Sequence, residues 1–266
     1  MNMTVDAPSI LFLFLMGSIF GSFLNVVIYR VPKKMSLITP ASHCFKCKKG
    51  IPFQYNVPIL GYYLLNGKCK FCQQSFPSRY VFVELITAIL TIIIYLIFGF
   101  TPLFFMYIIL TYLLIAVTFV DIDHFIIPNG FILFGIMVLA VGLFYDLLSI
   151  SWEDSVSGSF VFAGFLFGIG LIGQFILKKE SIGFGDVKLG LVLGGFLGVE
   201  YSVLALYLSF AISAILVIAF YGNKIKSGDA KIPFGPYLAA GTLISLFTIE
   251  PSGGNYILNW YYSTMF

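Results

Sequence analysis

The sequence has 266 residues, of which 59% are hydrophobic and only 10% are charged. Soluble domains carry about 25% charged residues, so this composition excludes a water-soluble globular protein. The formal net charge of +3 gives no reason to expect a nucleic acid as a partner. We therefore predict an all-α polytopic membrane protein embedded in the lipid bilayer.

The first apolar segment, residues 9–29, is interpreted as a retained transmembrane helix rather than a signal peptide. Asp6 is the only charged residue before it, so the basic region that opens a signal peptide is missing. No A-x-A cleavage site follows, and the basic residues come after the apolar run instead. Residues 1–29 are therefore predicted to form the first helix, with the N-terminus outside.

A polar insertion, residues 30–80, follows the first segment and contains all the cysteines of the chain. They form two C-x-x-C pairs, Cys44-Phe-Lys-Cys47 and Cys69-Lys-Phe-Cys72, which are separated by 21 residues. This spacing is typical of a zinc ribbon, and neighbouring lysines offset the charge of four thiolates. We expect a structural Zn²⁺ at Cys44, Cys47, Cys69 and Cys72. Two disulfides or four free thiols are the alternatives, and His43 is more simply a surface residue.

Seven further apolar segments follow the insertion. They are residues 81–99, 102–120, 127–148, 158–177, 187–199, 201–221 and 237–250. A spanning helix needs about 20 apolar residues. The chain is therefore predicted to have about eight transmembrane helices, although the sixth and the eighth segments are short enough to be half-helices.

The basic residues sort to one side of this topology. If the N-terminus is outside, all 15 Lys and Arg fall in the segments 30–80, 178–188 and 222–236. The opposite side receives only acidic residues, namely Asp6, Asp146, Glu153, Asp154, Glu200 and Glu250. Cytoplasmic loops are enriched in Lys and Arg, so the cysteine-containing loop is predicted to be cytoplasmic.

Two carboxylates lie where a membrane makes charge costly. Asp121 follows the third apolar segment, Asp186 precedes the sixth, and both ends face the same side at similar depth. Ionisable groups at membrane depth are usually functional. Two adjacent carboxylates can share one proton, so that one activates water and the other protonates the leaving group. This is aspartyl-protease chemistry, which requires neither a metal nor a cofactor. Alternatively, Asp186 is a helix N-cap and Asp121 faces water at the interface.

Other residues near these aspartates are expected to support them. Gly183 and Gly185 would let a substrate backbone approach closely, and Pro128 follows Asp121 in the sequence. Asp123 lies two residues from Asp121, so on a helix its side chain would point elsewhere. We treat Asp123 as secondary.

These motifs together resemble the bacterial type IV prepilin peptidases, also called prepilin leader peptidase/N-methyltransferases. Gly183-Phe-Gly-Asp186 resembles the G-x-G-D motif of membrane aspartyl proteases, and Asp121, seven residues before Pro128-Asn129, matches the first catalytic aspartate of the family. Similar agreement extends over nearly the whole chain. It includes Gly21–Pro32, Asn66–Cys72, Ser78-Arg-Tyr80 with Glu84, and Pro233–Pro236. Two positions depart from the family pattern, Phe45 and Val81, where proline is usual.

The resemblance implies a bifunctional enzyme of the bacterial cytoplasmic (inner) membrane. Such an enzyme removes the short basic leader of a prepilin or pseudopilin after a glycine, at the cytoplasmic face. It then methylates the new N-terminal residue, often Phe, using S-adenosylmethionine. For the second step the candidates are Asn25, Arg79, Tyr80 and Glu84. The alternative is that these residues anchor the loop to the membrane.

The predicted organisation is a first helix at 1–29, a four-cysteine loop at 30–80 linked to methyl transfer, and a transmembrane peptidase bundle at 81–266. Three other readings of the chain remain open. One is an intramembrane aspartyl protease with other substrates and no methyltransferase activity. The others are a non-enzymatic zinc-ribbon scaffold for an assembly machine and a transporter with carboxylates in its pathway.

Overall fold

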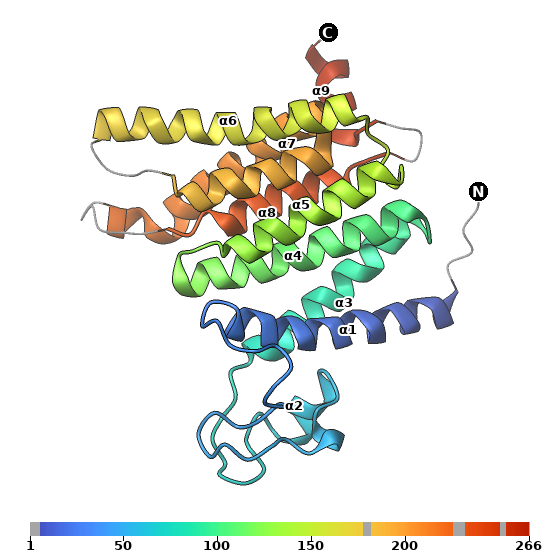
Figure 1. The fold of residues 1–266 in the computed structure, drawn as a ribbon, viewed down its shortest axis with the longest axis vertical. Coiled ribbons are helices and arrows are strands. Elements are labelled where there is room, and N and C mark those ends of the chain that lie inside the picture. The colour runs from blue at the N-terminus through green and yellow to red at the C-terminus, as the bar shows by residue number, and fades with distance from the viewer. Residues whose placement is uncertain (1–5, 178–181, 226–231, 251–253, 266) are drawn as a thin grey trace. The chain divides into compact units, whose positions relative to one another are not determined.

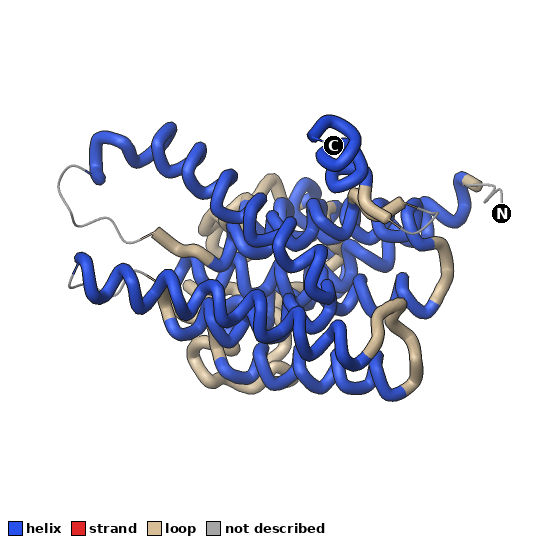
Figure 2. Tube along the Cα trace, turned by 90° about the horizontal axis from the view of Figure 1, so that it is seen from above, coloured by secondary structure: helices blue, strands red, loops and turns tan. Residues whose placement is uncertain are grey.

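The computed structural model describes residues 6–177, 182–225, 232–250 and 254–265. Within these residues the regular structure is helical, with isolated β-bridges but no strand (Figure 2). The chain divides into two compact units, Met1–Gly99 and Phe100–Phe266. The predicted all-α class is confirmed.

Each unit has its own set of helices (Figure 1). The first unit contains α1 (Ala7–Arg30), the 3₁₀ helix η1 (Phe53–Tyr55), α2 (Leu60–Leu64) and α3 (Arg79–Phe98). The second contains α4 (Pro102–His124), α5 (Asn129–Phe144), α6 (Trp152–Leu177), α7 (Phe184–Ile225), α8 (Gly235–Phe247) and α9 (Tyr256–Met265).

Glycines bring α1 and α3 into backbone contact in the first unit. A Cβ atom at Gly21 would lie 2.6 Å from Cα of Glu84, and one at Gly17 would lie 2.7 Å from Cα of Ala88. In lipid, where hydrophobic burial does not drive helices together, small residues permit the close approach that stabilises a helix pair. This contact places Glu84 of α3 directly beside α1.

In the second unit, α7 packs against α5, α6 and α8, and α4 packs against α5 and α8. Serine hydroxyls contribute to the contact between α6 and α7. Ser155 donates a hydrogen bond to the carbonyl of Gly195, and Ser159 donates one to the carbonyl of Leu191, both at 2.8 Å. Such bonds between membrane helices supplement van der Waals packing.

Helix α7 is interrupted at Gly198. This residue has φ +70° and ψ −176°, a conformation that glycine adopts without the steric cost of a side chain. The backbone N–H of Val199 donates to Oδ1 of Asp154 at 3.1 Å, so a side chain from α6 caps the second stretch. The two stretches correspond to the predicted segments 187–199 and 201–221.

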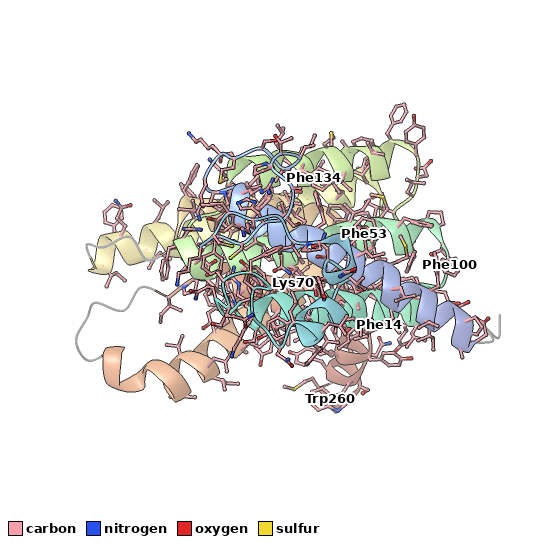
Figure 3. The ribbon with its side chains drawn as sticks, turned by 90° about the horizontal axis from the view of Figure 1, so that it is seen from below. Phe14, Phe53, Lys70, Phe100, Phe134 and Trp260 are labelled. Carbon is pink, nitrogen blue, oxygen red and sulfur yellow. The ribbon has the colours of Figure 1, made fainter. Side chains whose placement is uncertain are left out.

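Five helices, α1, α3, α4, α6 and α7, are long and apolar enough to cross a membrane, and α5 and α8 are shorter apolar helices. All eight predicted segments overlap these helices, although the segments 127–148 and 237–250 extend beyond the ends of α5 and α8. A polytopic membrane protein is confirmed. Helix α9 was not predicted. Its residues are outside the core, and Trp260 points away from the ribbon in Figure 3.

The predicted orientation of the chain stays a prediction. Lys178, Lys179, Lys226 and Lys231, which contribute to it, lie outside the described residues. The structure also shows where the helix formed by the third predicted segment ends. Helix α4 continues beyond residue 120 to His124, so Asp121 belongs to a helix rather than to a loop.

Candidate active sites in the two units

Asp121 lies in the last turn of α4 and is only 5% exposed. Its Oδ2 accepts a hydrogen bond of 2.8 Å from the backbone N–H of Gly235, the first residue of α8. The positive end of a helix dipole stabilises a carboxylate at this position. A Cβ atom at position 235 would lie 2.8 Å from the same oxygen, so only glycine leaves room for this contact without a shift.

Asp186 lies in the first turn of α7 and is 8% exposed. Its carboxyl group accepts a hydrogen bond from the backbone of Gly183 and interacts electrostatically with Asp121. Since α7 begins at Phe184, Asp186 is inside the helix and is not its N-cap. The structure therefore brings the two predicted aspartates together, each beside the N-terminus of a helix.

The predicted supporting residues fall into two groups. A Cβ atom at Gly183 would lie 3.1 Å from Oδ2 of Asp186, and one at Gly185 would lie 3.2 Å from Cβ of Ile127. Pro128, next to Ile127, is the residue that precedes α5. These residues therefore border the aspartate pair. Asp123 is exposed near the end of α4, whereas Asp121 on the same helix is buried.

Two contacts near the aspartates were not predicted. One is the bond from Gly235, which lies 114 residues from Asp121 in the sequence. The other joins α7 to α5, because Nζ of Lys188 donates to Oδ1 of Asn129 at 3.0 Å. Gly235 belongs to the motif Pro233–Pro236 and Asn129 to the motif Pro128-Asn129. No local pattern in the sequence identifies the distant partner of either residue.

In the first unit the four cysteines form one cluster. Their Sγ atoms all lie within 4.8 Å of one another, with 3.7 Å between Cys44 and Cys72 and 3.8 Å between Cys47 and Cys69. Tetrahedral Zn²⁺ with Zn–S bonds of about 2.3 Å requires sulfur separations of about 3.8 Å. The geometry fits a four-thiolate metal site and confirms that the cluster can hold a metal.

The two cysteine pairs have the same local structure. The N–H of Lys48 donates to the carbonyl of Cys44, and the N–H of Gln73 donates equivalently to the carbonyl of Cys69. Lys48 and Gln73 both have positive φ, 60° and 56°. Each turn therefore aims its two thiols at the shared centre, as the spacing predicts.

Backbone groups in these turns favour thiolates. Hydrogen bonding from the Cys47 backbone lowers the pKa of the Cys44 thiol to about 6, despite the opposing effect of burial. Hydrogen bonding from the Cys72 backbone lowers the pKa of Cys69. At Cys72 the Gln74 backbone acts in the same direction, but burial and the neighbouring thiols outweigh it and raise the pKa to about 11. Backbone hydrogen bonds thus favour the thiolate, the form that binds a metal cation, in one cysteine of each pair.

Beside the cluster the first unit contains a cavity of about 510 Å³. Its walls come from one face of α1, the start of α3 and the cysteine-containing loop. Three of the four predicted methyl-transfer residues, Asn25, Tyr80 and Glu84, line it, whereas Arg79 does not. Aromatic side chains from the loop also line it, including Phe45, Tyr55, Tyr62 and Phe76.

The polar groups of the cavity wall are held mainly by the backbone. Nδ2 of Asn25 donates to the carbonyl of Tyr80 at 3.0 Å, and Oε2 of Glu84 accepts from the N–H of Ile59 at 2.6 Å. The guanidinium of Arg30 donates to the carbonyls of Ser36 and Pro40. The wall thus presents both a buried carboxylate and a buried cation.

Comparison with known proteins identifies relatives for both units. The profile of the bacterial peptidase A24 N-terminal domain matches residues 15–98, and that of the type IV leader peptidase family matches residues 108–218. The chain is 33% identical to a prepilin leader peptidase/N-methyltransferase of Aeromonas salmonicida, over 95% of this chain and 93% of that protein.

Two other relatives carry names of the same kind of enzyme. A prepilin leader peptidase/N-methyltransferase of Pseudomonas aeruginosa is 32% identical over 87% of this chain and 88% of its own. A type 4 prepilin-like proteins leader peptide-processing enzyme of Escherichia coli is 31% identical over 87% and 91%. No solved structure matches the chain.

Proposed function

Because this chain belongs to the type IV leader peptidase family, we propose that it cleaves the leader peptide of a prepilin or pseudopilin with Asp121 and Asp186. The observation that carries this proposal is the pairing of two buried carboxylates from α4 and α7. A buried pair of like charges favours a shared proton, which is the state that aspartyl-protease chemistry requires.

In the proposed mechanism, the ionised member of the pair removes a proton from water as the oxygen attacks the scissile carbonyl. The protonated member then donates its proton to the leaving amine. The N–H of Gly235 holds one oxygen of Asp121 and so fixes the carboxylate in the pair. Since the two groups interact, the proton belongs to the pair rather than to either residue.

We propose an orientation of the chain from the distribution of its charges. The basic residues number 15, and they all fall on one side of the predicted topology. We therefore place the cysteine loop and both aspartates at the cytoplasmic face of the bacterial inner membrane, with the N-terminus outside. A leader that precedes a substrate's membrane helix reaches the pair from that face, with cleavage expected after a glycine.

Methyl transfer is proposed for the cavity of the first unit. Its aromatic side chains suit the adenine ring of S-adenosylmethionine, and its polar groups suit the charged ends of that molecule. S-adenosylmethionine supplies an electrophilic methyl group when it is bound. Asn25, Tyr80 and Glu84 would orient the reactants, and Arg79 would lie outside the site.

A structural Zn²⁺ at the four cysteines would support the same cavity. His43, Phe45 and Lys48, which lie in or beside the first cysteine pair, also line the cavity. A closed four-thiolate shell leaves no position for catalysis. The role that we propose for zinc is therefore to hold this wall in place.

Mass spectrometry of a prepilin-like substrate tests the proposal. Membranes that contain the wild type, Asp121→Asn or Asp186→Asn would be incubated with substrate, with and without S-adenosylmethionine. Asp123→Asn is the matched control, because Asp123 is an exposed aspartate at the end of the same helix. We expect the wild type and the control to remove the leader and to add about 14 Da in the presence of the methyl donor.

The two buried-aspartate variants should leave the substrate intact while remaining folded. If they cleave as fast as the control, Asp121 and Asp186 do not carry out the cleavage and the proposed peptidase mechanism is wrong. If the wild type itself leaves the substrate intact, the scaffold interpretation becomes the better one. If cleavage occurs but no methyl group is ever added, the chain is a peptidase without the second activity.

A further inference from the structure

Two buried polar side chains in the wall of the cavity require an explanation beyond their lining role. Asn25 of α1 and Glu84 of α3 are each only 8% exposed, and both lie on helices long enough to span a membrane. A carboxylate at such a position is costly unless it has a partner or a task. The guanidinium of Arg30, which lines the same cavity, donates to backbone carbonyls. Glu84 accepts hydrogen bonds from the N–H of Ile59 and from the hydroxyl of Ser22.

Asn25 has one satisfied and one unsatisfied polar atom. Its Nδ2 donates to the carbonyl of Tyr80 at 3.0 Å, and this bond fixes the amide orientation because a flip would oppose two oxygens. Its Oδ1 then has no hydrogen-bond partner among the residues that the structure describes. A buried acceptor without a donor is rare in proteins and points to a missing donor.

Glu84 holds a strained turn of the loop. Ile59 has φ 62° and ψ −60°, and the N–H of Leu60 donates to the carbonyl of Pro58 across it, which makes a γ-turn. This turn is rare, and a β-branched residue makes it more costly. The N–H of Ile59 itself donates to Oε2 of Glu84 at 2.6 Å. Strain that the surroundings maintain in this way is concentrated at ligand sites.

From these three observations we infer that Asn25 and Glu84 form a subsite for the amino group of a ligand. Both residues line the cavity, and an ionised carboxylate and an amide oxygen accept hydrogen bonds but do not donate them. The carboxylate further favours a donor with positive charge. The inference rests on the proposed methyl transfer, which involves two amino groups.

Two amino groups take part in the proposed methyl transfer. The first is the freed α-amine of the cleaved substrate, and the second is the α-amino group of S-adenosylmethionine. In the transfer the lone pair of the acceptor nitrogen forms a bond to the methyl carbon, and the carbon–sulfur bond breaks with its electrons going to sulfur. The acceptor nitrogen must lose a proton, because an α-amine has a pKa of about 8. If the subsite holds the acceptor, Glu84 takes this proton. If it holds the methyl donor, Glu84 fixes the orientation of that donor.

Calorimetric binding to the purified full chain in lipid nanodiscs tests the inference. Glu84→Gln removes the charge but keeps an acceptor for the N–H of Ile59, and Asn25→Leu removes the unsatisfied oxygen. Thr87→Val is the matched control, because Thr87 is a buried polar residue one turn along α3 that does not line the cavity. The zinc content of the four-cysteine cluster, which belongs to the same unit as these residues, reports that the altered unit of each variant is folded.

Two pairs of probes distinguish the two amino groups. S-adenosylhomocysteine is compared with 5′-methylthioadenosine, which lacks the amino-acid part. A mature pilin-like N-terminal peptide with a free amine is compared with the same peptide after acetylation. We expect Glu84→Gln and Asn25→Leu to weaken the binding of one amino-bearing probe about ten- to hundredfold, as for a lost charge-assisted hydrogen bond. The affinity for the matched probe without a free amine should change less than about threefold.

A selective loss in the nucleoside pair assigns the subsite to the methyl donor, and one in the peptide pair assigns it to the acceptor. If both variants bind all four probes as Thr87→Val does, the inference is overturned while methyl transfer in the cavity still stands. If the wild type binds neither nucleoside, methyl transfer does not occur in this cavity and the inference falls with it.

Discussion

The contact between Asp121 and Gly235 offers a sharp test of the peptidase site. In the variant Gly235→Ala the added Cβ would lie 2.8 Å from Oδ2 of Asp121 and 3.3 Å from its Cβ and Cγ. Ordinary carbon–oxygen contacts are several tenths of an ångström longer, so either the carboxylate or the start of α8 must move. The hydrogen bond of 2.8 Å from the Gly235 N–H then lengthens or bends.

Hydrogen bonds to charged groups contribute about 1.5–3 kcal/mol. If the displaced carboxylate loses this stabilisation in the transition state, the rate falls about ten- to hundredfold, because each 1.36 kcal/mol is a factor of ten. We expect Gly235→Ala to reduce kcat for leader cleavage by this amount. Steady-state cleavage of a prepilin-like substrate in nanodiscs, followed by mass, measures the change.

Gly164→Ala is the matched control for this substitution. Gly164 lies within α6, and nothing lies within 4 Å of a Cβ atom placed there. This variant should cleave like the wild type, and binding of S-adenosylhomocysteine should be unchanged in both variants. If Gly235→Ala also cleaves at the rate of Gly164→Ala, the backbone of α8 does not position Asp121 and the reasoning is refuted.

Three further predictions concern other parts of the chain. Cys44→Ser should remove bound zinc and weaken S-adenosylhomocysteine binding at least tenfold, with leader cleavage retained, as metal analysis and calorimetry would show. Gly21→Leu should destabilise the contact between α1 and α3 by about 1–3 kcal/mol, because its Cβ meets Cα of Glu84 at 2.6 Å; denaturant unfolding measures this. Lys188→Met should slow cleavage less than about fivefold, because its bond to Asn129 is exposed and such contacts contribute at most about 1 kcal/mol.

A different result would contradict each of these three predictions. Zinc content unchanged in Cys44→Ser would contradict a four-thiolate site. A Gly21→Leu protein as stable as Gly164→Ala would show that α1 and α3 are not held by close backbone contact. A Lys188→Met protein that loses cleavage altogether would mean that Lys188 belongs to the catalytic arrangement.

Composition and local pattern were sufficient for the membrane class, the helical segments and the cysteine cluster. A chain with 10% charged residues cannot solvate its surface, and apolar runs in lipid must be helical to satisfy their backbone. The two C-x-x-C turns are local structures, so their spacing alone predicted the convergence of their four thiols. The aspartates could be singled out because charge near a membrane is costly.

Partners distant in sequence required the tertiary structure. The Gly235 N–H reaches Asp121 across 114 residues, and Glu84 meets the N–H of Ile59 across 25 residues. Periodicity shows which face of a helix is apolar but not which other helix covers it, so neither contact could be read from the chain. The cavity beside the cysteines likewise arises from packing, because its walls come from segments that are separate in the sequence.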